Sequence, residues 1–224
     1  MNQTLARTIT LPQAVALYVA AVIGAGVLLL PGSGATEAGP ASLLAWAFDC
    51  LLGIPLALTF ALLASRYPDA GGVSTFTAKA FGPTVGAIVG WFYFFGVAAG
   101  GQIIVPLTGA YYVAAALHLS RTGTFALAAI LLTTAVMTNL HGLRVSGKIA
   151  LALSIGVVLL LVAATLVSLP RMHLSAWVPF LPHGILSIGR VSLLIFFAFA
   201  GWEAIAQLSA EFRNPQRDML RSTV

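Results

Sequence analysis

Six apolar segments occupy most of the sequence, and each is close to or above the roughly 20 residues that a helix needs to cross a bilayer. They lie near residues 12–31, 41–65, 84–117, 123–140, 149–169 and 185–210. Only 8% of the residues are charged, whereas a soluble domain has roughly 25%. We therefore expect an all-α integral membrane protein with six transmembrane helices, the first of which is retained rather than cleaved as a signal peptide.

The positive charges are divided unevenly between the loops that connect these segments. With the N-terminus inside the cell, eight lysines and arginines are cytoplasmic and three are external. Cytoplasmic loops carry an excess of Lys and Arg, so we expect a multi-pass protein of the plasma or inner membrane with both termini in the cytoplasm. This topology accounts for the net charge of +5 without a nucleic acid partner. The cytoplasmic set is Arg7, Arg66, Lys79, Arg144, Lys148, Arg213, Arg217 and Arg221, and the external set is Arg121, Arg171 and Arg190.

The residue types that carry enzymatic or metal chemistry are few and scattered. The single cysteine, Cys50, lies inside the second apolar segment, and the four histidines lie near helix ends without metal-ligand spacing. The sequence pattern also pairs no buried nucleophile with a base. We therefore predict that the chain is not an enzyme and that it holds no metal and no cofactor.

The first apolar segment contains a stretch, GAGVLLLPG at residues 24–32, that suits a transmembrane helix poorly. Each glycine costs about 1 kcal/mol relative to alanine inside a helix, and a freed backbone group in hydrocarbon finds no water. Such a break is tolerable where it faces a polar cavity, and the free N–H groups of residues 23–27 would then bind a carboxylate. The other interpretation is that the small residues only allow close helix packing.

The last apolar segment has a comparable interruption at residues 198–201, followed by an acid, Glu203, at membrane depth. Two interrupted helices in one bundle are the best sequence indication of a transporter binding site. The second break therefore favours a binding site over packing.

Three motifs resemble those of the amino acid, polyamine and organocation transporter superfamily. They are GAGVLLLPG, the RYPDAGG…AFG stretch at residues 66–82, and FAFAGWEAIAQLSAEFRNPQRD at residues 197–218. Within that superfamily the sequence is most similar to bacterial exporters of methionine and branched-chain amino acids. The resemblance covers almost the whole chain and implies a LeuT-like fold, in which a five-helix repeat is followed by an inverted copy and helices 1 and 6 are discontinuous.

By this resemblance the chain is a single transmembrane domain that is incomplete relative to the family. Residues 12–169 would form the first five-helix repeat, residues 185–210 the sixth helix and residues 211–224 a cytoplasmic segment. The implied activity is secondary active transport of small neutral amino acids across the lipid bilayer by alternating access. The alternative is an inactive half-transporter or assembly module that needs a separate second half to supply helices 7–12.

The resemblance also assigns roles to the residues of both breaks. The first break would bind the substrate carboxylate, carbonyl groups near residues 196–200 would bind the amino group, and Trp202 would act as a gate. The implied substrate-binding residues are Ile23, Gly24, Ala25, Gly26, Val27, Phe196, Phe199, Ala200, Gly201 and Trp202.

Two acids, Glu203 and Asp49, lie well inside the predicted membrane region. A charged acid at the centre of a helix costs roughly 2.5–3.5 kcal/mol on insertion scales, so both should face the bundle interior. Glu203 is either a functional residue, as a proton site or an organiser of the broken helix, or a structural residue whose hydrogen bond caps freed backbone groups. Asp49 is either a proton carrier or a neutral acid bonded to a neighbouring helix, and we favour the second. H⁺ is the candidate coupling ion, although the fifth segment lacks the buried lysine of some proton-coupled relatives.

Overall fold

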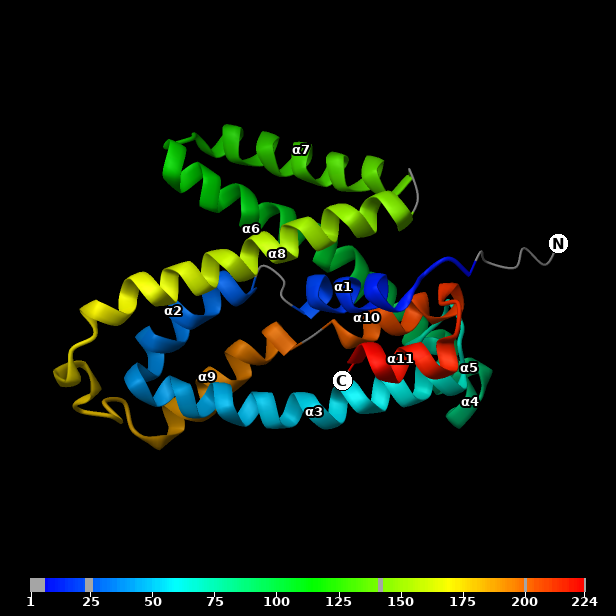
Figure 1. Ribbon diagram of the computed structural model, residues 1–224, viewed down its shortest axis with the longest axis horizontal. Helices are drawn as coiled ribbons and strands as arrows, with labels where there is room; N and C mark the ends of the chain where they lie inside the picture. The colour runs from blue at the N-terminus through cyan, green and yellow to red at the C-terminus, as the bar shows by residue number, and fades with distance from the viewer. Residues whose placement is uncertain (1–6, 23–25, 141–142, 200, 224) are drawn as a thin grey trace. The chain divides into compact units, whose positions relative to one another are not determined.

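The computed structural model describes residues 7–22, 26–140, 143–199 and 201–223, and most of these residues are helical (Figure 1). Within the described ranges, five helical stretches are long and apolar enough to cross a membrane. They are Leu29–Arg66, Pro83–Leu117, Arg121–Leu140, Gly147–Arg171 and Ile185–Glu211, and a shorter apolar helix covers Leu11–Val22. The expectation of an all-helical protein with several candidate membrane spans is therefore confirmed for the described residues.

The helical elements follow one another closely along the chain. The α-helices are α1 (Leu11–Val22), α2 (Gly26–Ala38), α3 (Ser42–Arg66), α4 (Val73–Phe81), α5 (Pro83–Phe92), α6 (Gly100–Leu117), α7 (Arg121–Leu140), α8 (Leu143–Ser168), α9 (Ile185–Ile195), α10 (Trp202–Gln207) and α11 (Pro215–Thr223). Short 3₁₀ turns form η1 (Gly39–Ala41), η3 (Leu169–Arg171), η4 (Leu174–Trp177), η5 (Phe196–Phe199) and η6 (Leu208–Glu211), and η2 (Tyr93–Ala99) is a π-helical turn.

Contacts divide the chain into two units, residues 1–72 with 150–224 (unit 1) and residues 73–149 (unit 2). In unit 1, α3 is the scaffold, because α9, α10 and α11 all pack against it. Its buried positions recur every three or four residues, so they share one helix face. All but one are small, which lets the neighbouring helices approach closely: Ser42, Ala45, Asp49, Gly53, Ala57, Ala61 and Ala64.

An apolar cluster joins the first half of α3 to α2 and α9. Its buried members are Leu30 and Ala38 of α2, Ala45 of α3, and Val191 and Ile195 of α9. These helices therefore pack as a three-helix group within unit 1, and α9 lies against both α2 and α3.

The other end of α3 lies where distant parts of unit 1 come together. The Ile9 N–H donates to the Glu211 carbonyl at 3.0 Å, and the Arg213 N–H donates to the Ile9 carbonyl at 3.1 Å. The Asp69 N–H, just after α3, donates to Ser209 Oγ at 3.1 Å. The N-terminal segment, the end of α3 and the residues after the last span therefore meet on one side of unit 1.

In unit 2, helix α4 packs against α5. Two glycines of α5 face α4. A Cβ added at Gly86 would lie 2.5 Å from Ala78 Cβ, and one at Gly90 would lie 3.2 Å from Ser74 Cβ. Close packing therefore depends on these two positions, whereas Gly96, Gly100 and Gly101 have no described atom within 4 Å of such a Cβ.

The Gly86→Ala variant should destabilise the α4–α5 contact, because the added methyl group cannot fit without a shift of α4. Overpacking of this kind costs about 1–3 kcal/mol. We expect a lower melting temperature for the variant in detergent, measured by the loss of helical circular dichroism. Gly101→Ala is the matched control in the same unit and should leave the melting temperature unchanged or slightly higher; equal melting temperatures for the two variants would contradict the packing role of Gly86.

Candidate substrate site at two helix breaks

The first expected break falls between α1, which is described as far as Val22, and α2, which is described from Gly26. Ile23, Gly24 and Ala25, three of the residues expected to bind the substrate, lie outside the described residues. Gly26 and Val27, the other two residues expected at this break, lie in α2.

The second break lies between α9 and α10 and begins earlier than the sequence suggested. The α-helix ends at Ile195, Phe196–Phe199 form the 3₁₀ turn η5, and α10 begins at Trp202. Gly201 has φ = +130° and ψ = −21°, a conformation that side-chain-bearing residues rarely adopt. Ala200 lies outside the described residues. The predicted interruption of this last span is therefore confirmed, and Gly201 is the residue that permits it.

The two breaks face each other across the interior of unit 1. A Cβ added at Gly201 would lie only 2.7 Å from the Ala21 carbonyl oxygen, in the last turn of α1. A Cβ added at Gly26 would lie 3.7 Å from the Cα of Ala198 in η5. The end of α1 therefore contacts the start of the α10 half, and the start of α2 contacts the end of the α9 half.

Aromatic side chains surround these contacts. The rings of Tyr18 in α1 and Trp202 in α10 are 5.7 Å apart, and Trp202 Nε1 is buried without an acceptor among the described residues. On the other side, the rings of Trp46 and Phe199 are 6.1 Å apart. Sequence reasoning missed Tyr18 and Trp46, because an aromatic residue in an apolar helix is most often part of the core.

Glu203 bonds to the backbone of the break itself. Its Oε2 accepts a hydrogen bond of 2.9 Å from the N–H of Gly201. An acid in the first turn of a helix also interacts favourably with the helix dipole. The structure thus shows the backbone-capping role that was one of our two interpretations of this residue.

Asp49 is fully buried in α3 and accepts a hydrogen bond of 2.6 Å from Ser192 Oγ of α9 at its Oδ1. The expected bond to a neighbouring helix is therefore present. Its other oxygen, Oδ2, is buried without a partner among the described residues.

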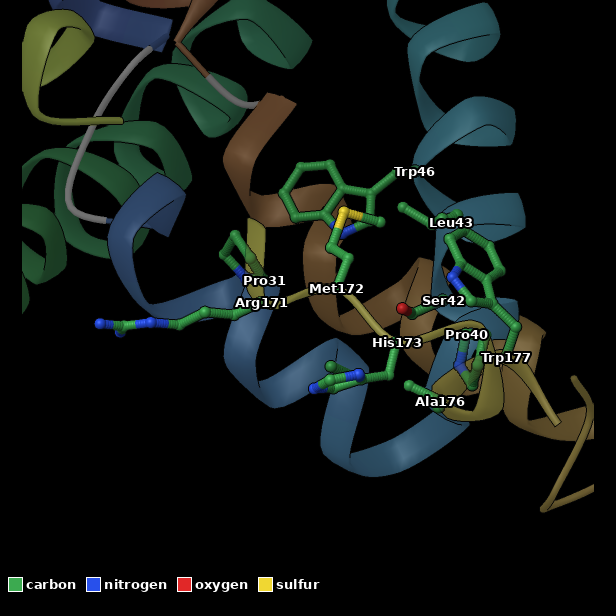
Figure 2. Close-up of a pocket in the computed structure, with 12 residues that line it drawn as sticks. Pro31, Pro40, Ser42, Leu43, Trp46, Arg171, Met172, His173, Ala176 and Trp177 are labelled. Atoms are coloured by element: carbon green, nitrogen blue, oxygen red, sulfur yellow. The ribbon is translucent and has the colours of Figure 1, made fainter. Parts of the chain in front are cut away.

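A cavity of about 530 Å³ lies at the beginning of α3, in the same unit. Figure 2 shows Trp46 and Trp177 with their rings over it, whereas the Arg171 side chain extends away from them. The cavity is lined in part by Pro31, Ser42, Trp46, Met172, His173 and Trp177. Because Trp46 also contacts Phe199, this one side chain stands between the cavity and the second break.

The residues on either side of positions 23–25 lie beside the second break within unit 1. Tyr18, Trp202 and Phe199 contribute aromatic rings to this region.

The Gly201→Ala variant should lose stability, because the conformation of this residue and its contact with the Ala21 carbonyl both exclude a methyl group. A strained backbone position of this kind costs about 1–3 kcal/mol. A clearly lower melting temperature in detergent is the expected result. Gly189→Ala in α9, where no described atom lies within 4 Å of the added Cβ, is the control in the same span; equal stability of both variants would show that the breaks do not touch as described.

Comparison with known proteins shows the family of the chain. Residues 9–224 match the amino acid permease family. The chain is 39% identical to the uncharacterised amino acid permease YecA of Bacillus subtilis over 98% of its own length and 51% of the relative. It is 31% identical, over 95% of itself and 50% of the relative, to the L-methionine/branched-chain amino acid exporter YjeH of Escherichia coli. It is 30% identical, over 93% of itself and 48% of the relative, to the branched-chain amino acid permease BcaP of Bacillus subtilis.

The chain thus spans about half the length of these curated relatives. The match over nearly all of the chain, together with its apolar helices, identifies a membrane protein of the amino acid, polyamine and organocation transporter superfamily. This chain belongs to the amino acid permease family.

Proposed function

We propose that the chain forms the first part of a secondary transporter for small neutral amino acids that works by alternating access. The observation that carries this proposal is the contact between the two helix breaks, Gly201 with Ala21 and Gly26 with Ala198. Interrupted helices that meet in the membrane interior are the usual site of substrate binding in transporters built from repeats. The substrates named for the exporter and the permease above supply the substrate class.

In this proposal residues 12–169 are a LeuT-like first repeat and residues 185–210 are its sixth helix. Six spans are obtained when α1 and α2 are counted as the two halves of one broken helix. Helices 7–12 would come from a second half, and alternating access would move one repeat against the other. The chain without those helices would then be the inactive module that the alternative hypothesis describes.

The two ends of the substrate would bind at different breaks. Backbone N–H groups of residues 23–27 would bind the carboxylate, and carbonyl groups near residues 196–200 would bind the ammonium group. Trp202, whose Nε1 has no acceptor among the described residues, and Phe199 would contact the side chain and close the site. This role fits the packing of the half-buried Trp202 against Tyr18 and the position of Phe199 beside Trp46.

Replacement of Gly26 tests the carboxylate site. The described atoms nearest to a Cβ at this position belong to Leu30, a flexible side chain at 3.1 Å, and to Ala198 at 3.7 Å, so Gly26→Leu should fold. In the proposed site its longer side chain would block the approach of a carboxylate to the backbone N–H groups. We expect affinity for methionine or leucine to fall by at least about tenfold, equivalent to about 1.4 kcal/mol. Affinity and melting temperature would be measured together, in the chain co-expressed with a second half.

Gly90→Leu is the packing control, because a side chain there meets Ser74 in unit 2 rather than the breaks. It should lower the melting temperature while the folded fraction still binds. Normal affinity in a well-folded Gly26→Leu variant would rule out the carboxylate site.

We also propose a plasma or inner membrane location with both termini in the cytoplasm. In unit 1, Arg7, Arg213 and Arg217 line a cavity beside Pro68, which follows α3. Arg171 lies instead near Ser42 at the start of α3. The 25 residues of α3 correspond to about 37 Å of helix, enough to separate these groups across a bilayer.

Labelling of single cysteines tests this orientation. Arg213→Cys and His173→Cys, each made in a Cys50→Ala background because Cys50 is exposed, should react with impermeant maleimide from opposite faces of the membrane. His173→Cys should react in intact cells and Arg213→Cys only after permeabilisation. Reaction of both positions in intact cells would overturn the topology.

A further inference from the structure

A cavity of about 410 Å³ in unit 1, which we call the basic cavity, lies beside Pro68 just after the end of α3. Three of its lining residues are the exposed arginines Arg7, Arg213 and Arg217. The others are uncharged: Pro68, Asn214, Pro215 and Gln216. A concave surface lined by charges of one sign concentrates ions of the opposite sign, so the basic cavity attracts anions.

Backbone hydrogen bonds bring these arginines together from distant parts of the chain. The Arg213 N–H donates to the carbonyl group of Ile9 at 3.1 Å, two residues after Arg7. The Asn214 carbonyl group accepts the Arg217 N–H at 3.1 Å, where α11 begins. The backbone of unit 1 therefore fixes the positions from which the three side chains reach one cavity.

The carboxylates of unit 1 do not neutralise the basic cavity. Among the described residues, none of its three guanidinium groups forms an ion pair. Asp69, the residue after Pro68, instead accepts the Gly71 N–H at 2.7 Å with its Oδ1. Guanidinium groups around one cavity repel one another, and an anion with several acceptor oxygens would offset that repulsion.

The basic cavity lies where candidate membrane spans end. The span Leu29–Arg66 ends two residues before Pro68, and the span Ile185–Glu211 ends two residues before Arg213. Arg7 lies four residues before the first residue of the apolar helix α1. Basic residues at the ends of spans lie at the depth of the lipid headgroups, so the anion that meets this cavity at high local concentration is a lipid phosphate.

We propose that the basic cavity binds the phosphate group of an anionic phospholipid. The planar guanidinium group donates two parallel hydrogen bonds to a phosphate, and three such groups from Arg7, Arg213 and Arg217 would bind one phosphate from several sides. An anionic headgroup is favoured over a zwitterionic one, because choline or ethanolamine would bring a positive charge next to the arginines. In the proposed orientation this lipid belongs to the cytoplasmic leaflet, whereas the binding site itself does not depend on transport.

Native mass spectrometry of the purified chain in detergent tests this site. Phosphatidylglycerol should bind at least about tenfold more tightly than phosphatidylcholine with the same acyl chains. Each basic residue near a lipid surface contributes about fivefold in affinity, so Arg213→Gln combined with Arg217→Gln should weaken phosphatidylglycerol binding by at least about tenfold. Both side chains are exposed, so the melting temperature without added lipid should not change.

Arg171→Gln combined with Arg190→Gln is the matched control. It removes the same charge from two other exposed arginines, which lie outside the basic cavity. Phosphatidylglycerol affinity should stay within about twofold of the wild type. An equal loss of affinity in the two double variants would reduce the effect to general charge attraction and would overturn the proposal.

A single variant and a free anion complete the test. If the Arg213 and Arg217 double variant fails to fold, Arg7→Gln should still weaken phosphatidylglycerol binding by about fivefold, and unchanged affinity would overturn the site. Inorganic phosphate that raises the melting temperature as much as phosphatidylglycerol, with no preference between the two lipids, would also overturn it. Selective lipid binding by a chain that shows no amino acid flux with a second half supplied would support the site and contradict only the proposed function.

Discussion

Unit 1 depends on one constraint: a helix interrupted inside a membrane must find partners for the backbone groups that the interruption frees. At the second break, Glu203 accepts a hydrogen bond from the Gly201 N–H. This backbone group at the start of α10 therefore has a partner in place of water. The carbonyl end of α1 lies directly against Gly201. Only a residue without a side chain allows this approach. Gly201 and Glu203 therefore act together: the first permits the interruption, and the second provides a partner for the backbone N–H group at this position.

Helix α3 packs against both halves of the interrupted last span. Its buried face consists of small residues from Ser42 to Ala64, and α9 and α10 pack on this face. Small side chains make the contact close but provide little directional bonding. Asp49 is the exception, because its hydrogen bond to Ser192 holds the last turn of α9, the turn that precedes the break. Helix α3 therefore holds α9 in part through a hydrogen bond, whereas it holds α10 through apolar contacts.

The sequence predicted the broad features because they follow from long-range averages. Segment length and low charge predicted the membrane helices, and the small residues at 198–201 predicted the interruption of the last span. The break expected at residues 23–27 falls largely outside the described residues. Local detail was less predictable. The nine residues of helix α4 are too few for their apolar spacing to distinguish a helix from the glycine-rich, polar stretch that precedes it. Contacts such as Tyr18 with Trp202 depend on how distant segments pack, which the identity of neither residue reveals.

The pairing of the half-helices has a mechanical consequence. In unit 1 the first half of the first span, α1, packs against the second half of the last span, α10, while α2 packs against α9 (Figure 1). Each pair thus combines one half from each broken helix, and the two breaks lie side by side between the pairs. In the proposed transporter, a rotation of α9 relative to α10 would change backbone angles at Phe196–Phe199 and Gly201. It would leave the hydrogen bonds within α9 and α10 intact, so this interruption permits a hinge at low cost in backbone hydrogen bonds.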